Sequence, residues 1–152
     1  MPEPRPENQR LGALVGTWRT EGIVLGDDGS TEIARVQGTD AYEWLGAHFL
    51  IHRIDVTMGG EPVQGLEIIG PYEADTGGFP TRAYDNHGNV QTSMATVAGD
   101  GVWTFGADGA KATLRVAADG RDAHADWVRS DDNGASWRPW MRLDLTKRPE
   151  SG

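Results

Sequence analysis

Several ionisable and aromatic side chains of this sequence lie on short stretches that are otherwise apolar. His52 falls between Leu50 and Ile54, on the same face of an extended chain. A titratable group enclosed among apolar side chains has a displaced pKa, and a displaced pKa suits proton transfer. His52 and Tyr84 are the favoured candidates for general acid–base catalysis. The wider set of candidates adds His124, Asp55, Glu67, Asp85 and Asp126. Each of them, taken singly, also has a purely structural explanation.

Other kinds of chemistry find less support. The absence of Cys excludes thiolate nucleophiles, disulfides and Cys-ligated metal sites. No Ser lies in a recognisable nucleophile elbow. His48 and His52 would lie roughly 13 Å apart on a strand, which is too far to share one ion. An EF-hand loop whose invariant Gly is Gly134 would need Asp where Arg129 stands and Glu where Trp140 stands. We therefore expect neither a metal site nor a cofactor.

Tryptophan is the residue type from which a binding site would be built. The chain has six, of which Trp18 and Trp137 fall where a structural role is expected. The other four fall on four different expected strands, where they could converge on a ring system or an apolar chain. The simpler alternative is that they only fill the interior. The predicted ligand-binding residues are Trp44, His52, Arg82, Tyr84, Trp103, Trp127, Trp140 and Met141, with Arg82, Arg142 or His52 orienting a polar end of the ligand.

The elements that carry these residues are predicted from turn chemistry. Asp-Gly, Asn-Gly and Gly-Gly pairs recur at short intervals and supply the positive φ angles of tight hairpins. Nine such turns separate ten runs that are rich in β-branched and aromatic residues. We expect strands near 16–25, 31–44, 48–58, 63–72, 79–85, 90–97, 101–106, 111–117, 122–130 and 136–146. Only 7–15 is a plausible helix, and it is short.

The strands have no intervening crossover helix, so neighbours should pair antiparallel. Closing ten such strands into an up-and-down barrel removes the exposed edges and leaves room for a cavity. The fold class is therefore all-β, with a single barrel domain over residues 1–152. Residues 1–6 and 147–152 are expected to be flexible tails.

Composition narrows the partners and the location. A formal net charge of −9 disfavours electrostatic binding of nucleic acid or anionic lipid over a broad surface. The first residues contain no apolar run typical of a signal peptide, and no segment approaches the length of a membrane span. We expect a cytoplasmic protein with a small-molecule partner and no nucleic-acid or membrane partner.

The segment from Leu11 to Trp18, an apolar helix that runs into Gly16-x-Trp18, resembles the signature of the calycin superfamily, which contains the lipocalins and fatty-acid-binding proteins. The resemblance implies a barrel whose Trp18 closes one end beneath an Arg from the last strand, a place that Arg142 or Arg148 could fill. Further segments resemble a bacterial calycin-like family of unknown function: Tyr42-Glu43-Trp44-Leu45, Gly65 to Gly70, Tyr84 to Val90, and the hairpin from Trp127 to Trp137.

Two other resemblances bear on function. Nitrobindins are calycin-like barrels that hold haem through a His on the last strand, and the run Trp137 to Thr146 has no His. Haem is therefore disfavoured. The pattern Ser130-x-Asp132-x-Gly134-x-Ser136-Trp137 resembles the Asp-box of sialidase propellers, where it is a structural hairpin. It occurs once, and we interpret it as a hairpin clamp.

Three functional hypotheses follow. The first is a barrel that binds a small, largely apolar molecule, such as a lipid, polyketide or aromatic metabolite. The second is a cofactor-free cyclase, isomerase or hydratase that uses His52, Tyr84 or an Asp in the same cavity. The third is a protein–protein role through a barrel face, as in a homodimer, for which the sequence offers no positive feature.

Overall fold

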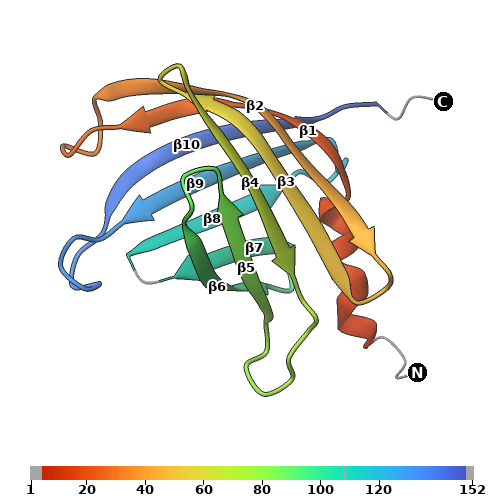
Figure 1. Ribbon diagram of the computed structural model, residues 1–152. Helices are drawn as coiled ribbons and strands as arrows, with labels where there is room; N and C mark the ends of the chain where they lie inside the picture. The colour runs from red at the N-terminus through yellow and green to blue at the C-terminus, as the bar shows by residue number, and fades with distance from the viewer. Residues whose placement is uncertain (1–4, 108, 150–152) are drawn as a thin grey trace.

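Ten antiparallel strands close into one barrel in the computed structural model, which describes residues 5–107 and 109–149 (Figure 1). Each strand pairs with its neighbours in sequence, and β1 closes the ring against β10. The strands are β1 (Gly16–Leu25), β2 (Glu32–Leu45), β3 (Phe49–Met58), β4 (Glu61–Ile69), β5 (Phe79–Asp85), β6 (Val90–Val97), β7 (Val102–Ala107), β8 (Ala110–Val116), β9 (Asp122–Arg129) and β10 (Arg138–Lys147). The predicted fold class is confirmed, and most strand bounds fall within three residues of the predicted ones.

A 3-10 helix, η1 (Pro6–Leu14), closes one end of the barrel (Figure 1). Its Leu11 and Leu14 are fully buried in a cluster that includes Leu50, Ile69 and Phe79 from the strand ends. These side chains form the floor of the barrel. The predicted tails are shorter where the structure describes them, because Pro6 belongs to η1 and Lys147 to β10.

Trp18 occupies the floor as the sequence resemblance implied, but its cationic neighbour differs. The indole Nε1 donates to the Leu14 carbonyl at 2.9 Å, which fixes the ring beneath η1. Lys147 Nζ lies 4.9 Å from the ring centroid, where Arg142 or Arg148 was expected. Lys147 has this place because it lies directly opposite Trp18 in the β1–β10 register.

Close packing of neighbouring strands explains why two positions within the strands are glycine. A Cβ on Gly22 would lie 2.1 Å from the Arg142 carbonyl oxygen, and one on Gly38 would lie 2.2 Å from that of Asp55. Both residues sit mid-strand in β1 and β2. They allow the backbones to approach closely where the sheet curves to close the barrel.

The opposite end of the barrel consists of the hairpins that follow β1, β3, β5, β7 and β9. The last of these is the predicted clamp. Asp132 accepts hydrogen bonds from Ser130 Oγ at 2.7 Å and from the Ser136 amide at 2.8 Å, while Ser130 Oγ accepts from the Gly134 amide at 2.8 Å. The structural role expected for this motif is confirmed.

None of the helices in the described part of the chain is both long and apolar enough to cross a bilayer.

Candidate ligand-binding cavity

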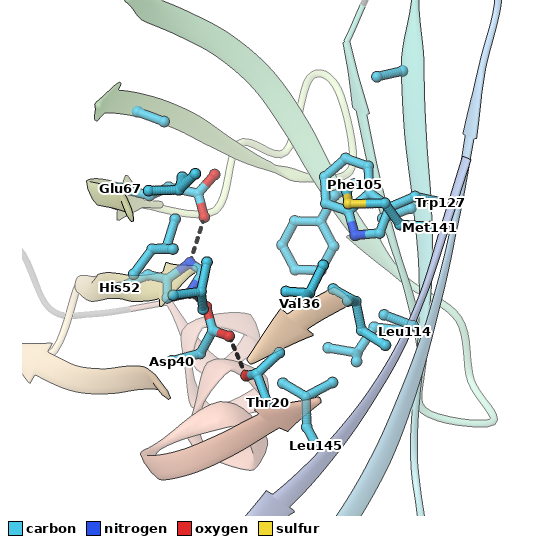
Figure 2. A pocket seen from close by; sticks show the side chains of 18 of the residues that line it. Thr20, Val36, Asp40, His52, Glu67, Phe105, Leu114, Trp127, Met141 and Leu145 are labelled. Carbon is cyan, nitrogen blue, oxygen red and sulfur yellow. Dashed lines mark hydrogen bonds and ion pairs between the residues drawn. The ribbon is translucent and has the colours of Figure 1, made fainter. Parts of the chain in front are cut away.

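The barrel encloses a cavity of about 300 Å³ between the floor and the hairpin end (Figure 2). This volume is at the lower end of the range for small-molecule sites. All ten strands contribute lining side chains, and most of these are apolar. The apolar lining is formed by Val36, Ile54, Val56, Met58, Val63, Ala83, Phe105, Ala110, Ala112, Leu114, Ala125, Trp127, Met141, Leu143 and Leu145.

Polar groups are confined to one side of the cavity. They come from β1 to β6 and comprise Thr20, Asp40, Tyr42, His52, Glu67, Thr81, Gln91 and Ser93. Figure 2 shows Thr20, Asp40, His52 and Glu67 together on one side, with Phe105, Leu114, Trp127 and Met141 on the other. A bound molecule would therefore contact an apolar wall and a polar wall at once.

A buried chain of hydrogen bonds organises the polar wall. His52 Nε2 lies 2.7 Å from Asp40 Oδ1, and His52 Nδ1 lies 3.0 Å from Glu67 Oε1. Thr20 Oγ1 donates to the second oxygen of Asp40. The register produces this contact set, because His52 lies directly opposite Glu67 and diagonally across from Asp40. The protonated imidazole satisfies both carboxylates, since it has a donor on each nitrogen.

The two carboxylates decide the charge of His52. Burial on its own would lower the pKa of the imidazole, because it disfavours the cation. The hydrogen bonds and the negative charges of Asp40 and Glu67 outweigh burial and raise the pKa of His52 from 6.5 to about 9. We therefore treat His52 as an imidazolium at neutral pH.

Tyr42 supports the same charge state. Its ring stacks on the imidazole of His52, with centroids 4.0 Å apart and planes inclined by 11°. An aromatic face attracts a cation at this distance. Burial, followed by the charges of Asp40 and Glu67, raises the pKa of the Tyr42 hydroxyl well above its usual value, so this group stays neutral.

One carboxylate oxygen remains available to a ligand. Both oxygens of Asp40 and both nitrogens of His52 are engaged. Among the described residues, Glu67 Oε2 receives no hydrogen bond, and Figure 2 shows it turned away from His52. No Arg or Lys is found among the cavity-lining residues that the structure describes. Glu67 Oε2 is thus the carboxylate oxygen that the polar wall offers to a ligand.

The structure brings three of the predicted site residues to the cavity wall: His52, Trp127 and Met141. The Trp103 side chain also points into the barrel, but it lies below the cavity. There it is 1% exposed and packs against Phe79 in the floor. Trp103 therefore supports the cavity from below.

Five other predicted site residues lie away from the cavity. Tyr84 is 42% exposed and packs beside Arg82 on the outer face of β5, because the alternate residues Thr81 and Ala83 face inward. The catalytic and binding roles predicted for Tyr84, and the binding role of Arg82, do not fit these positions. Arg142 is likewise exposed on the outer face of β10.

The remaining two are tryptophans displaced by local geometry. Trp44 has the inward alternation of Tyr42 but lies past the floor, against Gly12 of η1, and is 39% exposed. Trp140 is the extra residue of a β-bulge in β10, where the register shifts between Pro139 and Met141. It packs edge-on against Trp127, with centroids 5.8 Å apart. It therefore buttresses a wall residue without lining the cavity.

Sequence reasoning missed Asp40, Thr20 and Tyr42. Asp40 and Tyr42 alternate in step with Val36 along β2, and Thr20 does so with Trp18 along β1. That alternation was a usable signal that these polar residues share the inward face. Their contact with His52 depends on cross-strand register, which alternation does not specify.

The other ionisable candidates lie outside the cavity. His124 lies on the outer face between Asp126 and Asp144, at 3.0 and 2.8 Å, and these hydrogen bonds raise its pKa. Asp85 accepts the backbone amides of His87 and Asn89 in a hairpin, and Asp55 is exposed. Over residues 5–107 and 109–149, no group of three or more His, Asp, Glu or Cys is arranged to hold a metal ion.

Comparison with known proteins identifies the family and supports the fold. The chain belongs to the family described as "Protein of unknown function (DUF1579)", which matches residues 3–140. A comparison with curated proteins finds no match.

Solved structures of similar fold extend over nearly the whole chain. Rv2717c from M. tuberculosis has a TM-score of 0.69 at 14% identity, covering 97% of this chain and 100% of that one. The S-type phycobiliprotein lyase CPES from Guillardia theta has a TM-score of 0.66 at 11% identity, with the same coverage. A barrel named EF1p2_mFAP2b, solved bound to DFHBI, has a TM-score of 0.51 at 10% identity and covers 93% of this chain and 98% of that one. These likenesses support a calycin-like barrel fold.

Proposed function

We propose that this member of the DUF1579 family binds a small, largely apolar molecule inside its barrel. The observation that carries the proposal is the cavity of about 300 Å³, which all ten strands line, mostly with apolar side chains, and whose polar groups gather on one wall. A cavity of this kind buries most of a small ligand and fixes its orientation through a few polar contacts. A barrel of similar fold has been solved with the small molecule DFHBI, which adds support from architecture.

Aromatic and thioether side chains define the ligand class. Trp127, Phe105 and Met141 form a wall opposite the polar cluster (Figure 2). Aromatic rings favour edge-on and offset contacts with another ring, and the thioether of Met adapts its shape to the ligand. We expect a molecule with an aromatic ring or a short apolar chain.

Isothermal titration calorimetry with phenylbutanol tests this proposal. The alcohol carries a ring, a short chain and one neutral polar group, so it requires only the apolar cavity. We expect saturable binding to the native chain and at least tenfold weaker binding to Ala112→Phe and to Ala83→Phe, since both residues line the cavity and the added ring would fill it.

A matched control separates filling of the cavity from the presence of an extra ring. Ala118 is exposed in the turn after β8, so Ala118→Phe should bind phenylbutanol as the native chain does. Thermal unfolding of each variant verifies that it is folded. Equal binding by the native chain and a folded cavity-filled variant would contradict the proposal.

Proton transfer is a second candidate function, because the cavity holds two carboxylates and an imidazolium (Figure 2). Since both nitrogens of His52 are engaged, the group that could touch a substrate is Glu67. Its free oxygen could take a proton from the α-carbon of a β,γ-unsaturated ketone and return it at the γ-carbon. The conjugated product absorbs in the ultraviolet. A rate with the native chain no greater than in buffer would exclude this activity, and Glu67→Gln should abolish any rate observed.

A further inference from the structure

The charges that face the cavity do not balance. Asp40 and Glu67 are carboxylates and His52 is the cation between them, which leaves one net negative charge. The lining residues that the structure describes include no Lys or Arg to offset it. A ligand with a negative group would add a second uncompensated charge to a cavity that is otherwise apolar, and an unpaired buried charge is costly.

The hydrogen-bonding groups of the cluster also favour a ligand that donates over one that carries an acidic group. His52 can donate from both nitrogens, and each donor is held by a carboxylate at 3.0 Å or less. An acidic headgroup would therefore have to displace one of these partners. A donor on the ligand finds Glu67 Oε2, which receives no hydrogen bond from any described residue.

The depth of the cluster sets the orientation of a ligand. His52 is two residues along β3 from Leu50, a fully buried floor residue. At the far end of the same face, Met58 borders the β3–β4 hairpin. The polar cluster thus lies deep in the cavity, with apolar side chains between it and the hairpin end. A ligand that enters there must place its polar group innermost.

We propose that the cavity selects apolar molecules that carry one protonated nitrogen, and that this nitrogen donates to Glu67 Oε2 at the deep end. Charges would then alternate along Asp40, His52, Glu67 and the ligand, and the cluster would become neutral. The apolar part of the ligand would lie against Trp127 and Met141 (Figure 2). The inference rests on the proposed small-molecule binding and adds the chemical class of the ligand.

Three probes of the same shape test the selection by calorimetry at neutral pH: protonated phenylbutylamine, neutral phenylbutanol and anionic phenylbutanoate. We expect the amine to bind at least tenfold more tightly than either of the others, because close opposite charges attract strongly where water is excluded. Glu67→Gln should weaken binding of the amine at least tenfold and change binding of the alcohol less than threefold. Glu61→Gln, the same change at an exposed position of β4, should leave all three unchanged.

The outcomes separate this inference from the function on which it rests. Binding of phenylbutanoate at least as tight as that of the amine would overturn the charge selection, and so would equal binding of the alcohol and the amine. An amine preference that persists in Glu67→Gln would overturn the role of this carboxylate. Failure of the alcohol to bind, together with failure of the amine, would instead contradict the cavity as a binding site.

Discussion

His52 should keep its proton well above neutral pH, and its two carboxylate partners should be the cause. The pKa rises from 6.5 to about 9 in the folded chain. One pKa unit corresponds to about 1.4 kcal/mol, so the folded state gains about 3 kcal/mol from holding this proton more tightly than the unfolded chain does. Because the folded pKa is the higher one, this contribution is complete below about pH 6.5 and disappears as the pH rises through about 9.

The perturbation that tests this is the double substitution Asp40→Asn with Glu67→Gln, which keeps the shapes of both side chains and removes both charges. Urea unfolding at a series of pH values between 6 and 10 gives the free energy of unfolding of each protein. We expect the difference between the native chain and the variant to shrink by about 3 kcal/mol across this range. Nitrogen chemical shifts of the imidazole, followed by NMR, report the pKa directly.

His124 provides a matched control on the outer face. It also lies between two carboxylates, Asp126 and Asp144, but its side chain is 42% exposed. Solvent weakens such interactions, so Asp126→Asn with Asp144→Asn should change the pH dependence much less. A native His52 that titrates at or below 6.5, or a native pH dependence equal to that of the Asp40/Glu67 double variant, would refute the reasoning.

Three further predictions concern packing, the hairpin clamp and the cavity wall. Gly22→Ala should destabilise the fold by roughly 1–3 kcal/mol in urea unfolding, because its Cβ would meet the Arg142 carbonyl at 2.1 Å, whereas Gly99→Ala, with nothing within 4 Å, should be neutral. Asp132→Ala should accelerate amide hydrogen exchange at Ser136, whose amide donates to Asp132, and at Gly134, whose acceptor Ser130 Oγ is itself held by Asp132; unchanged exchange would argue against the clamp. Trp127→Phe should abolish most of the tryptophan fluorescence change caused by phenylbutylamine, while Trp44→Phe should retain it; the reverse would place the ligand elsewhere.

The fold was predictable because turn chemistry is local. Paired glycines such as Gly59 and Gly60, with φ angles of 58° and 84°, mark tight hairpins whatever the strands around them do. Once ten strands are separated by turns too short for a crossover, antiparallel pairing follows. Closure is then the arrangement that leaves no free edge.

The site was only partly predictable because it depends on geometry between strands. His52 could be singled out from its apolar neighbours on one strand. Tyr84 could not be placed, since either face of β5 had a plausible inward set until closure selected Thr81 and Ala83. Trp44 shows a different limit, because a residue can have the inward alternation and still lie beyond the floor.

Asp40 shows most clearly what single-strand patterns omit. Its neighbours along β2 mark it as inward-facing, yet its importance comes from Oδ1 lying 2.7 Å from His52 on the next strand. Register across the β2–β3 pair creates that contact. A cluster of three charged residues from three strands therefore becomes visible only once the strands are paired.

A crystal structure of the chain with phenylbutylamine tests the central claim most directly. We predict the phenyl ring between Trp127, Met141 and Leu114 inside the barrel, with the nitrogen at hydrogen-bond distance from Glu67 Oε2 and His52 still held by both carboxylates. Electron density for the amine only on the outer face, beside Tyr84 or Trp44, with the cavity wall unchanged, would contradict the claim.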